Sequence, residues 1–144
     1  AAAANRAGHV EVTRLLIDTS AYSFLLKGHS GVRDILQTIE AVFVSPVLIG
    51  EVLSGAKHTD KSHKYEDDLR RFLSSPRITV ADIDAETARC YAAIISGLRK
   101  AGEPVPVNDA WIAASAMQHG LPVLTSDAHF ERIPQIRVEM FSPR

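Results

Sequence analysis

The chain has 144 residues, a length that fits one domain with a sizeable core, since such a domain buries roughly 68–70% of its unfolded surface. Hydrophobic residues make up 46% and charged residues 23%, which is ordinary for a globular protein, and no apolar run reaches the ~20 residues that cross a membrane. The net charge of −1 argues mildly against a nucleic-acid partner, because such proteins usually carry a basic excess.

Short aliphatic or β-branched runs alternate with longer helical patterns along the chain. This alternation predicts an α/β fold with a largely parallel sheet. The helix after residue 45 has Ser45 as its N-cap and Pro46 at its first position, and the last helix stops at Gly120 before Pro122. The predicted strands are 15–17, 42–44, 78–80, 122–124 and 138–140, and the predicted helices lie near 21–26, 31–40, 46–57, 60–74, 84–101 and 107–119.

One domain is expected over residues 13–144, because no repeat, low-complexity segment or linker interrupts it. The chain opens on four alanines without an initiator Met, so residues 1–12 are expected to be a tag or a disordered segment. Cys90 is the only cysteine, which excludes an intrachain disulfide and favours a cytoplasmic protein.

Four acidic residues occupy positions where this fold would gather function. Asp18 follows the first predicted strand, Asp127 follows the fourth, and Asp109 opens the last helix. Glu51 lies in the second turn of the helix after the second strand. Because α/β sheets bind ligands at the carboxyl ends of their strands, these side chains are expected to converge.

Asp109 is the strongest single candidate among them. Helical spacing places it on one face with Ile112, Ala113 and Ala116, and that face should pack on the sheet. A carboxylate above a buried apolar stripe is costly unless a cation or several donors compensate it. Asn108 could cap the helix instead, so capping does not account for Asp109.

The other three acids have structural interpretations that the sequence leaves open. Asp18 and Asp127 could each cap a helix, although Thr19 or Ser20 could cap in place of Asp18. Glu51, at the edge of an apolar stripe, could be an exposed surface residue.

A cluster of carboxylates would suit hydrolysis of a phosphodiester. One or two divalent ions can activate water and neutralise charge on the phosphoryl and leaving oxygens. Oxygen ligands favour Mg²⁺ or Mn²⁺ over zinc. Thr125, at the end of the fourth strand, could hold a neighbouring carboxylate through its hydroxyl. His129 has no second ligand at metal-binding spacing, so a packed or exposed histidine is expected there.

The order and contexts of these acids resemble PIN-domain ribonucleases, particularly the VapC-type toxins of toxin–antitoxin pairs. The resemblance covers about residues 13–143, and it implies a sheet order of 3-2-1-4-5 with helices on both faces and Mg²⁺- or Mn²⁺-dependent endoribonuclease activity. Its matching stretches are 16–20, 45–53, 106–114 and 120–127.

The family pattern, carried over by position, also assigns roles to individual residues. It implies that Asp18 and Asp109 are the principal metal ligands and that Glu51 and Asp127 complete the acidic pocket. Thr125 would position a carboxylate. The remaining supporting residues of these stretches are Ser20 and Asn108.

The expected partners follow from the same resemblance: an RNA substrate, a small protein antitoxin and a second copy of the chain. The antitoxin is predicted to insert a basic side chain near Asp18 and Asp109, since an arginine fork pairs well with carboxylates. It is expected to lie across a groove between the helices near 31–40 and 46–57, lined by Ile35, Leu36, Ile39, Leu48 and Val52.

Rival functions fit the sequence less well. A haloacid-dehalogenase-type phosphatase needs a second Asp where Ser20 stands, and no Gly-rich nucleotide loop is present. The serious alternative is a catalytically inactive PIN fold that binds RNA or a protein. A basic stretch over residues 57–77 contains interspersed acids, so it is either a solvated helix face or a nucleic-acid contact.

Overall fold

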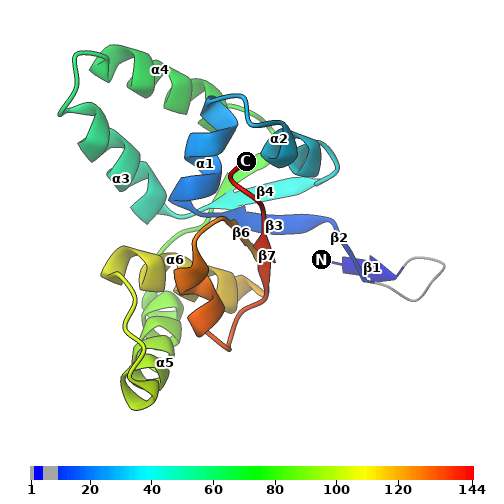
Figure 1. Cartoon of the computed structure of the whole chain (residues 1–144), viewed down its shortest axis with the longest axis vertical. Coiled ribbons are helices and arrows are strands. Elements are labelled where there is room, and N and C mark those ends of the chain that lie inside the picture. Colours follow the sequence, from blue (N-terminus) through cyan, green and yellow to red (C-terminus); the bar gives the residue numbers. More distant parts are fainter. Residues whose placement is uncertain (1, 5–9) are drawn as a thin grey trace.

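The computed structural model describes residues 2–4 and 10–144, and its centre is a five-stranded, all-parallel sheet (Figure 1). The strand order is β5-β4-β3-β6-β7, which is 3-2-1-4-5 in the numbering of the predicted strands and confirms the predicted fold class. The strands are β3 (Arg14–Ile17), β4 (Ala41–Val44), β5 (Ile78–Val80), β6 (Val123–Thr125) and β7 (Val138–Met140).

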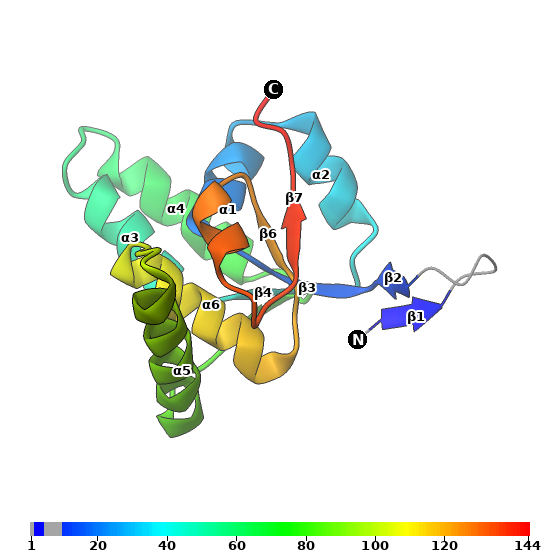
Figure 2. The same cartoon turned by 60° about the horizontal axis from the view of Figure 1, so that its bottom comes forward.

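Helices cover both faces of this sheet (Figures 1 and 2). One face carries α1 (Thr19–Leu26), α2 (Ser30–Gln37), α3 (Pro46–Ala56) and α4 (Ser62–Leu73). The other face carries α5 (Ala85–Ala101) and α6 (Val107–His119). A short 3₁₀ helix, η1 (Ala128–Arg132), follows β6. All six predicted helices are therefore confirmed, with ends shifted by a few residues.

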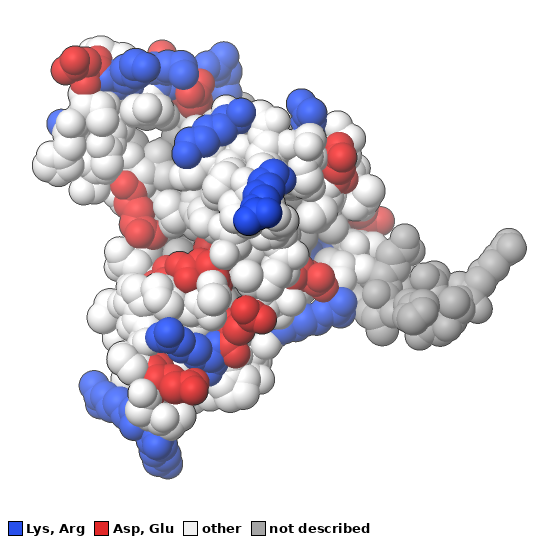
Figure 3. Space-filling view, in the orientation of Figure 1, with Lys and Arg blue, Asp and Glu red and all other residues white. Residues whose placement is uncertain are grey.

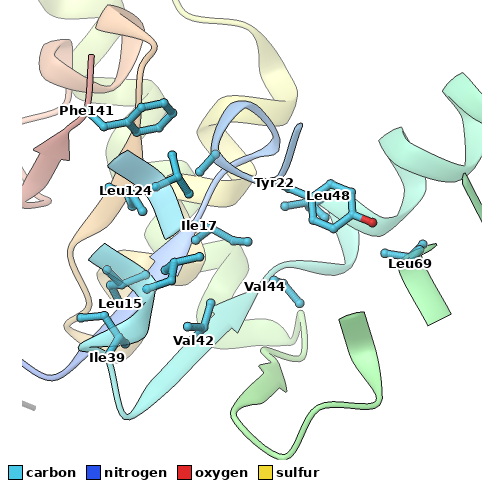
Figure 4. Close-up of a cluster of buried hydrophobic side chains, with 13 residues drawn as sticks. Leu15, Ile17, Tyr22, Ile39, Val42, Val44, Leu48, Leu69, Leu124 and Phe141 are labelled. Atoms are coloured by element: carbon cyan, nitrogen blue, oxygen red, sulfur yellow. The ribbon is translucent and has the colours of Figure 1, made fainter. Parts of the chain in front are cut away.

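The sheet separates two hydrophobic cores because successive strand residues point to opposite faces. Leu15 and Ile17 of β3 face the first core, where they pack with Tyr22 and Leu48 (Figure 4). Leu16, between them, faces the second core beneath α5 and α6. The chain leaving β3 is thus fixed on both sides, and this holds the residue that follows, Asp18, in one place.

The predicted helix boundaries at Ser45 and Gly120 are also confirmed. The Ser45 hydroxyl accepts a hydrogen bond from the Val47 amide at 3.1 Å, with Pro46 at the first helical position. Gly120 ends α6 with φ of 64°, a left-handed conformation that a side chain would make unfavourable.

The expected tag or disordered segment at residues 1–12 is only partly described. Ala2–Ala4 (β1) pairs antiparallel with Val10–Val12 (β2) in a separate two-stranded sheet, while residues 1 and 5–9 lie outside the described residues. That expectation therefore stays a prediction. Within residues 2–4 and 10–144, no helix is both long enough and apolar enough to cross a membrane.

The groove predicted between α2 and α3 is wrong. Leu36, Ile39 and Leu48, which were expected to line it, are buried in the first core. Ile35 and Val52 pack against that same core. The physical reason is that α1 packs against both α2 and α3, so Leu36, Ile39 and Leu48 are covered by the fold itself, while Val52 lines a hollow between α1, α3 and α4 instead.

Candidate metal centre

Asp18 sits at the junction of β3 and α1 and is only 3% exposed. One carboxylate oxygen accepts a hydrogen bond from the Ala21 amide at 2.9 Å, so Asp18 is the N-cap of α1. The expectation that Thr19 or Ser20 could cap equally well is therefore wrong. Burial raises the pKa of Asp18 above its ordinary value, although its hydrogen bonds act in the opposite direction.

Thr125 at the end of β6 and Ser20 in the first turn of α1 hold this carboxylate. Thr125 Oγ1 donates to Asp18 Oδ2 at 2.6 Å, which is the hydroxyl hydrogen bond expected from the sequence. Ser20 Oγ lies 2.8 and 2.9 Å from the two oxygens of Asp18 and accepts from the Ser126 amide at 3.2 Å. Because β3 and β6 are adjacent in the sheet, these bonds lock the two strand ends together.

Asp109 approaches the same place from the first turn of α6. No side chain caps this helix, so Asn108, which is exposed, does not have the capping role considered for it. Ile112 and Ala113 are fully buried beneath Asp109, as its helical face predicted. Burial, followed by the charges of Asp127 and Asp18, raises the pKa of Asp109 to about 6.

Asp127 and His129 form the third side of the site. The Asp127 carboxylate accepts a hydrogen bond from the His129 amide at 2.9 Å and so caps η1. The interpretation of Asp127 as a helix cap is therefore confirmed. His129 Nδ1 lies 3.0 Å from Asp127 Oδ1 and 3.5 Å from Asp109 Oδ2. His129 is partly exposed, as expected, but the expectation that no second ligand lies near it is wrong. Its second acidic neighbour, Asp109, is distant in sequence. Only the short spacing between Asp127 and His129 could have indicated that His129 belongs to the cluster.

Glu51 lies at the edge of the cluster rather than in its centre. Its Oε1 accepts a hydrogen bond from Thr19 Oγ1 at 2.7 Å, which ties α3 to the first turn of α1. Its charge is also among the factors that raise the pKa of Asp109. Glu51 is thus half-buried and oriented, unlike an isolated surface glutamate.

The donor set fits a divalent cation. Asp109, Asp127 and His129 each offer one ligand atom, and these atoms lie within 4.8 Å of one another. Asp18 and Glu51 lie outside this closest group but add negative charge that a cation would neutralise. Figure 3 shows acidic side chains gathered at the waist of the molecule, between the part that carries α1, α3 and α4 and the part that carries α5 and α6.

Comparison with known proteins places the chain in a family. A family model described as the PIN domain matches residues 15–136. The chain belongs to the PIN-domain family. This PIN domain is 33% identical over 130 residues to ribonuclease VapC11 of Mycobacterium tuberculosis, a match that covers 85% of the chain and 92% of that protein. Ribonuclease VapC4 of the same organism is 33% identical over 95 residues, covering 66% and 73%. The resemblance stated from the sequence is therefore confirmed.

Solved structures of similar proteins agree with the fold. The DNA-bound VapBC of Salmonella typhimurium superposes with a TM-score of 0.81 at 28% identity, covering 90% of the PIN domain and 98% of that chain. The VapBC2 of Rickettsia felis, bound to a promoter DNA fragment, gives a TM-score of 0.82 at 21% identity and supports the fold alone.

The raised pKa of Asp109 predicts a pH-dependent affinity for metal. A carboxylate binds a cation only after it loses its proton, so affinity for Mn²⁺ should be nearly constant above pH 6 and fall below it. The expected decrease is up to about tenfold per pH unit, the limit for one displaced proton. Calorimetric titration with Mn²⁺ at pH 5, 6 and 7.5 measures it. An affinity that stayed constant over this range would mean that Asp109 is not a ligand.

Proposed function

We propose that this PIN domain is a divalent-metal-dependent endoribonuclease and the toxin of a toxin–antitoxin pair. One observation carries the proposal: Asp18, Asp109 and Asp127 converge at the carboxyl edge of the sheet, although they come from three separate elements. Its curated relatives bear the name ribonuclease VapC, which supports assigning this acidic cluster to RNA hydrolysis.

Each residue has a part in the proposed mechanism. Asp109 and Asp127 would hold Mg²⁺ or Mn²⁺, with His129 within reach of the same position. When bound, such an ion activates water and neutralises charge on the phosphoryl and leaving oxygens. Asp18, held by Thr125, would be a further ligand of the same ion, as the family resemblance implies. Glu51, oriented by Thr19, closes the pocket on the side of α3.

The proposed partners are RNA, a small antitoxin protein and a second copy of the chain. The related structures are VapBC complexes, which supports an antitoxin, and the acidic pocket would attract a basic side chain from it. A position for that antitoxin between α2 and α3 does not fit the structure, because Leu36, Ile39 and Leu48 are buried there. An RNA substrate and a lone, buried Cys90 are both compatible with a cytoplasmic protein.

Incubation of the purified chain with a single-stranded RNA and with DNA of the same sequence tests the proposal. In Mn²⁺ or Mg²⁺, internal cleavage of the RNA is expected, and the DNA should remain intact. Binding of the RNA without cleavage in either metal would instead favour the alternative, an inactive PIN-fold binding module. Neither binding nor cleavage of any RNA would contradict both functions.

A further inference from the structure

Two surface hollows meet beside the acidic cluster. The first, with a volume of about 470 Å³, lies between α1, α3 and α4, and the second, of about 570 Å³, lies between α3 and the start of α6. Both volumes lie within the range of ~300–1,000 Å³ that is usual for ligand sites. The two hollows share Glu51 and Gly55, so they adjoin along α3 as one depression, and Asn108, which lines the second hollow, directly precedes Asp109 in the sequence. We call this depression the α3 channel.

The first hollow carries unpaired positive charge. Lys27 and Lys64 line it, and neither has a carboxylate partner within the described part of the chain. Asp68 also lines it, but this carboxylate is paired with Arg71 at 2.7 Å. The remaining acid is Glu51, at the end next to the metal centre. The two lysines, which have no carboxylate partner, therefore offer contacts to the phosphates of a strand that leads toward the site of hydrolysis.

No contact within the fold explains why α3 carries glycines on its face along the channel. Gly50 and Gly55 lie inside the helix, where glycine is less favourable than alanine. A Cβ built at either position would meet no atom within 4 Å, so the fold does not need these residues to be small. Glycine keeps the space free for something that approaches from outside.

Tyr22 adds an independent sign of a ligand. Its side chain is 1% exposed and lines the first hollow, yet its hydroxyl has no hydrogen-bond partner among the described residues. Burial and the charge of Asp68 raise the pKa of Tyr22 to about 12, so the hydroxyl keeps its proton and remains a donor. A buried donor without a partner is costly unless a ligand supplies the acceptor.

We propose that the α3 channel binds the single-stranded RNA on both sides of the cleaved phosphodiester, with Lys27 and Lys64 contacting phosphates and the bare Gly50–Gly55 face admitting the strand. This inference rests on the proposed ribonuclease function and adds the path of the substrate. Tyr65, half-buried beside Lys64 on the same wall, offers an aromatic ring on which a base can stack.

Binding of a labelled single-stranded RNA, measured in EDTA over a range of salt concentrations, tests the lysines. Each phosphate contact contributes about 0.7 to the slope of log affinity against log salt, so Lys27→Ala/Lys64→Ala should lower that slope by about 1.4. Affinity near physiological salt should fall by about tenfold. The matched control is Arg99→Ala/Lys100→Ala, which removes the same charge from the exposed end of α5.

Gly55 allows a second test that does not depend on charge. Gly55→Leu should weaken RNA binding by roughly tenfold or more, because its side chain would fill the place where the two hollows meet. Gly55→Ala is its control, since it makes the same gain in helix propensity with little added bulk. Neither variant should lower the melting temperature, because the fold has open space at this position.

Three outcomes would overturn the inference. The first is an unchanged salt slope in the lysine variant with unchanged RNA affinity in Gly55→Leu. The second is an equal loss in the Arg99/Lys100 control, which would reflect net charge alone. The third is an equal loss of RNA affinity in Gly55→Leu and Gly55→Ala, which would mean that filling the channel is not the cause. In all three, cleavage of RNA by the unmodified chain would leave the proposed function standing, and its absence would remove both.

Discussion

Asp109→Asn is expected to lower RNA cleavage by more than about 100-fold while the metal-free protein remains folded. Loss of residues that only orient metal ligands typically costs 10–100-fold, so loss of a ligand should cost more. Asparagine keeps the shape of the side chain but removes the charge that attracts the cation. Cleavage rates at saturating Mn²⁺ measure the effect, and Asp34→Asn, an exposed change on α2, is the matched control.

The same variant should make the metal-free protein more stable. The pKa of Asp109 is about 6 in the fold and 3.8 ordinarily, so the folded state binds this proton more tightly than the unfolded state. Stability is therefore lost as pH rises from about 4 through 6, and at pH 7 the full cost is present. Asparagine should therefore raise the free energy of unfolding by about 1–3 kcal/mol at pH 7, which corresponds to a rise of roughly 3–10 °C in melting temperature. The gain should be much smaller at pH 4. A large drop in melting temperature would mean that Asp109 has a structural role.

Removal of divalent metal is expected to lower RNA cleavage by at least about 1,000-fold. Metal ions contribute several kcal/mol of transition-state stabilisation, and each 1.36 kcal/mol corresponds to a factor of ten in rate. Excess EDTA should stop cleavage, and added Mg²⁺ or Mn²⁺ should restore it. Cleavage that persisted in excess chelator, with contaminating nucleases excluded, would show that the acidic cluster works without metal.

A stability measurement separates metal binding from activity. Mn²⁺ at about 100 times its dissociation constant should stabilise the folded chain by about 2.7 kcal/mol. The gain should be strongly reduced in Asp109→Asn and retained in Asp34→Asn. A gain of the same size in all three proteins would place the metal elsewhere on the surface.

Most of the fold was predictable because its signals are local. The strand and helix patterns, the Ser45–Pro46 start of α3 and the Gly120 end of α6 depend on residues within one or two turns of each other. The strand order is a different case. It was predicted only through the family resemblance, because hydrophobic patterns indicate strands but do not say which strands are neighbours.

The main errors in the sequence prediction concern contacts between distant residues. Leu36, Ile39 and Leu48 are expected from the sequence to face a partner, but they lie in the first core. Asp18 is expected from the sequence to be redundant as a cap. In the fold, Thr125, 107 positions away, holds its carboxylate beside the Ala21 amide. His129 looked isolated because its neighbour Asp109 reaches it from another helix.

The sequence by itself determined the elements of the central domain, their ends to within a few residues and the four candidate acids, since these follow from side-chain type and spacing. Only the tertiary structure decided that Asp18 is buried, that the pKa of Asp109 is about 6, and that His129 joins Asp109 and Asp127. It also decided that Glu51 stands where the two hollows of the α3 channel meet. The physical reason is that desolvation and charge interaction depend on which surfaces pack together, and strand pairing across long stretches of chain sets that packing.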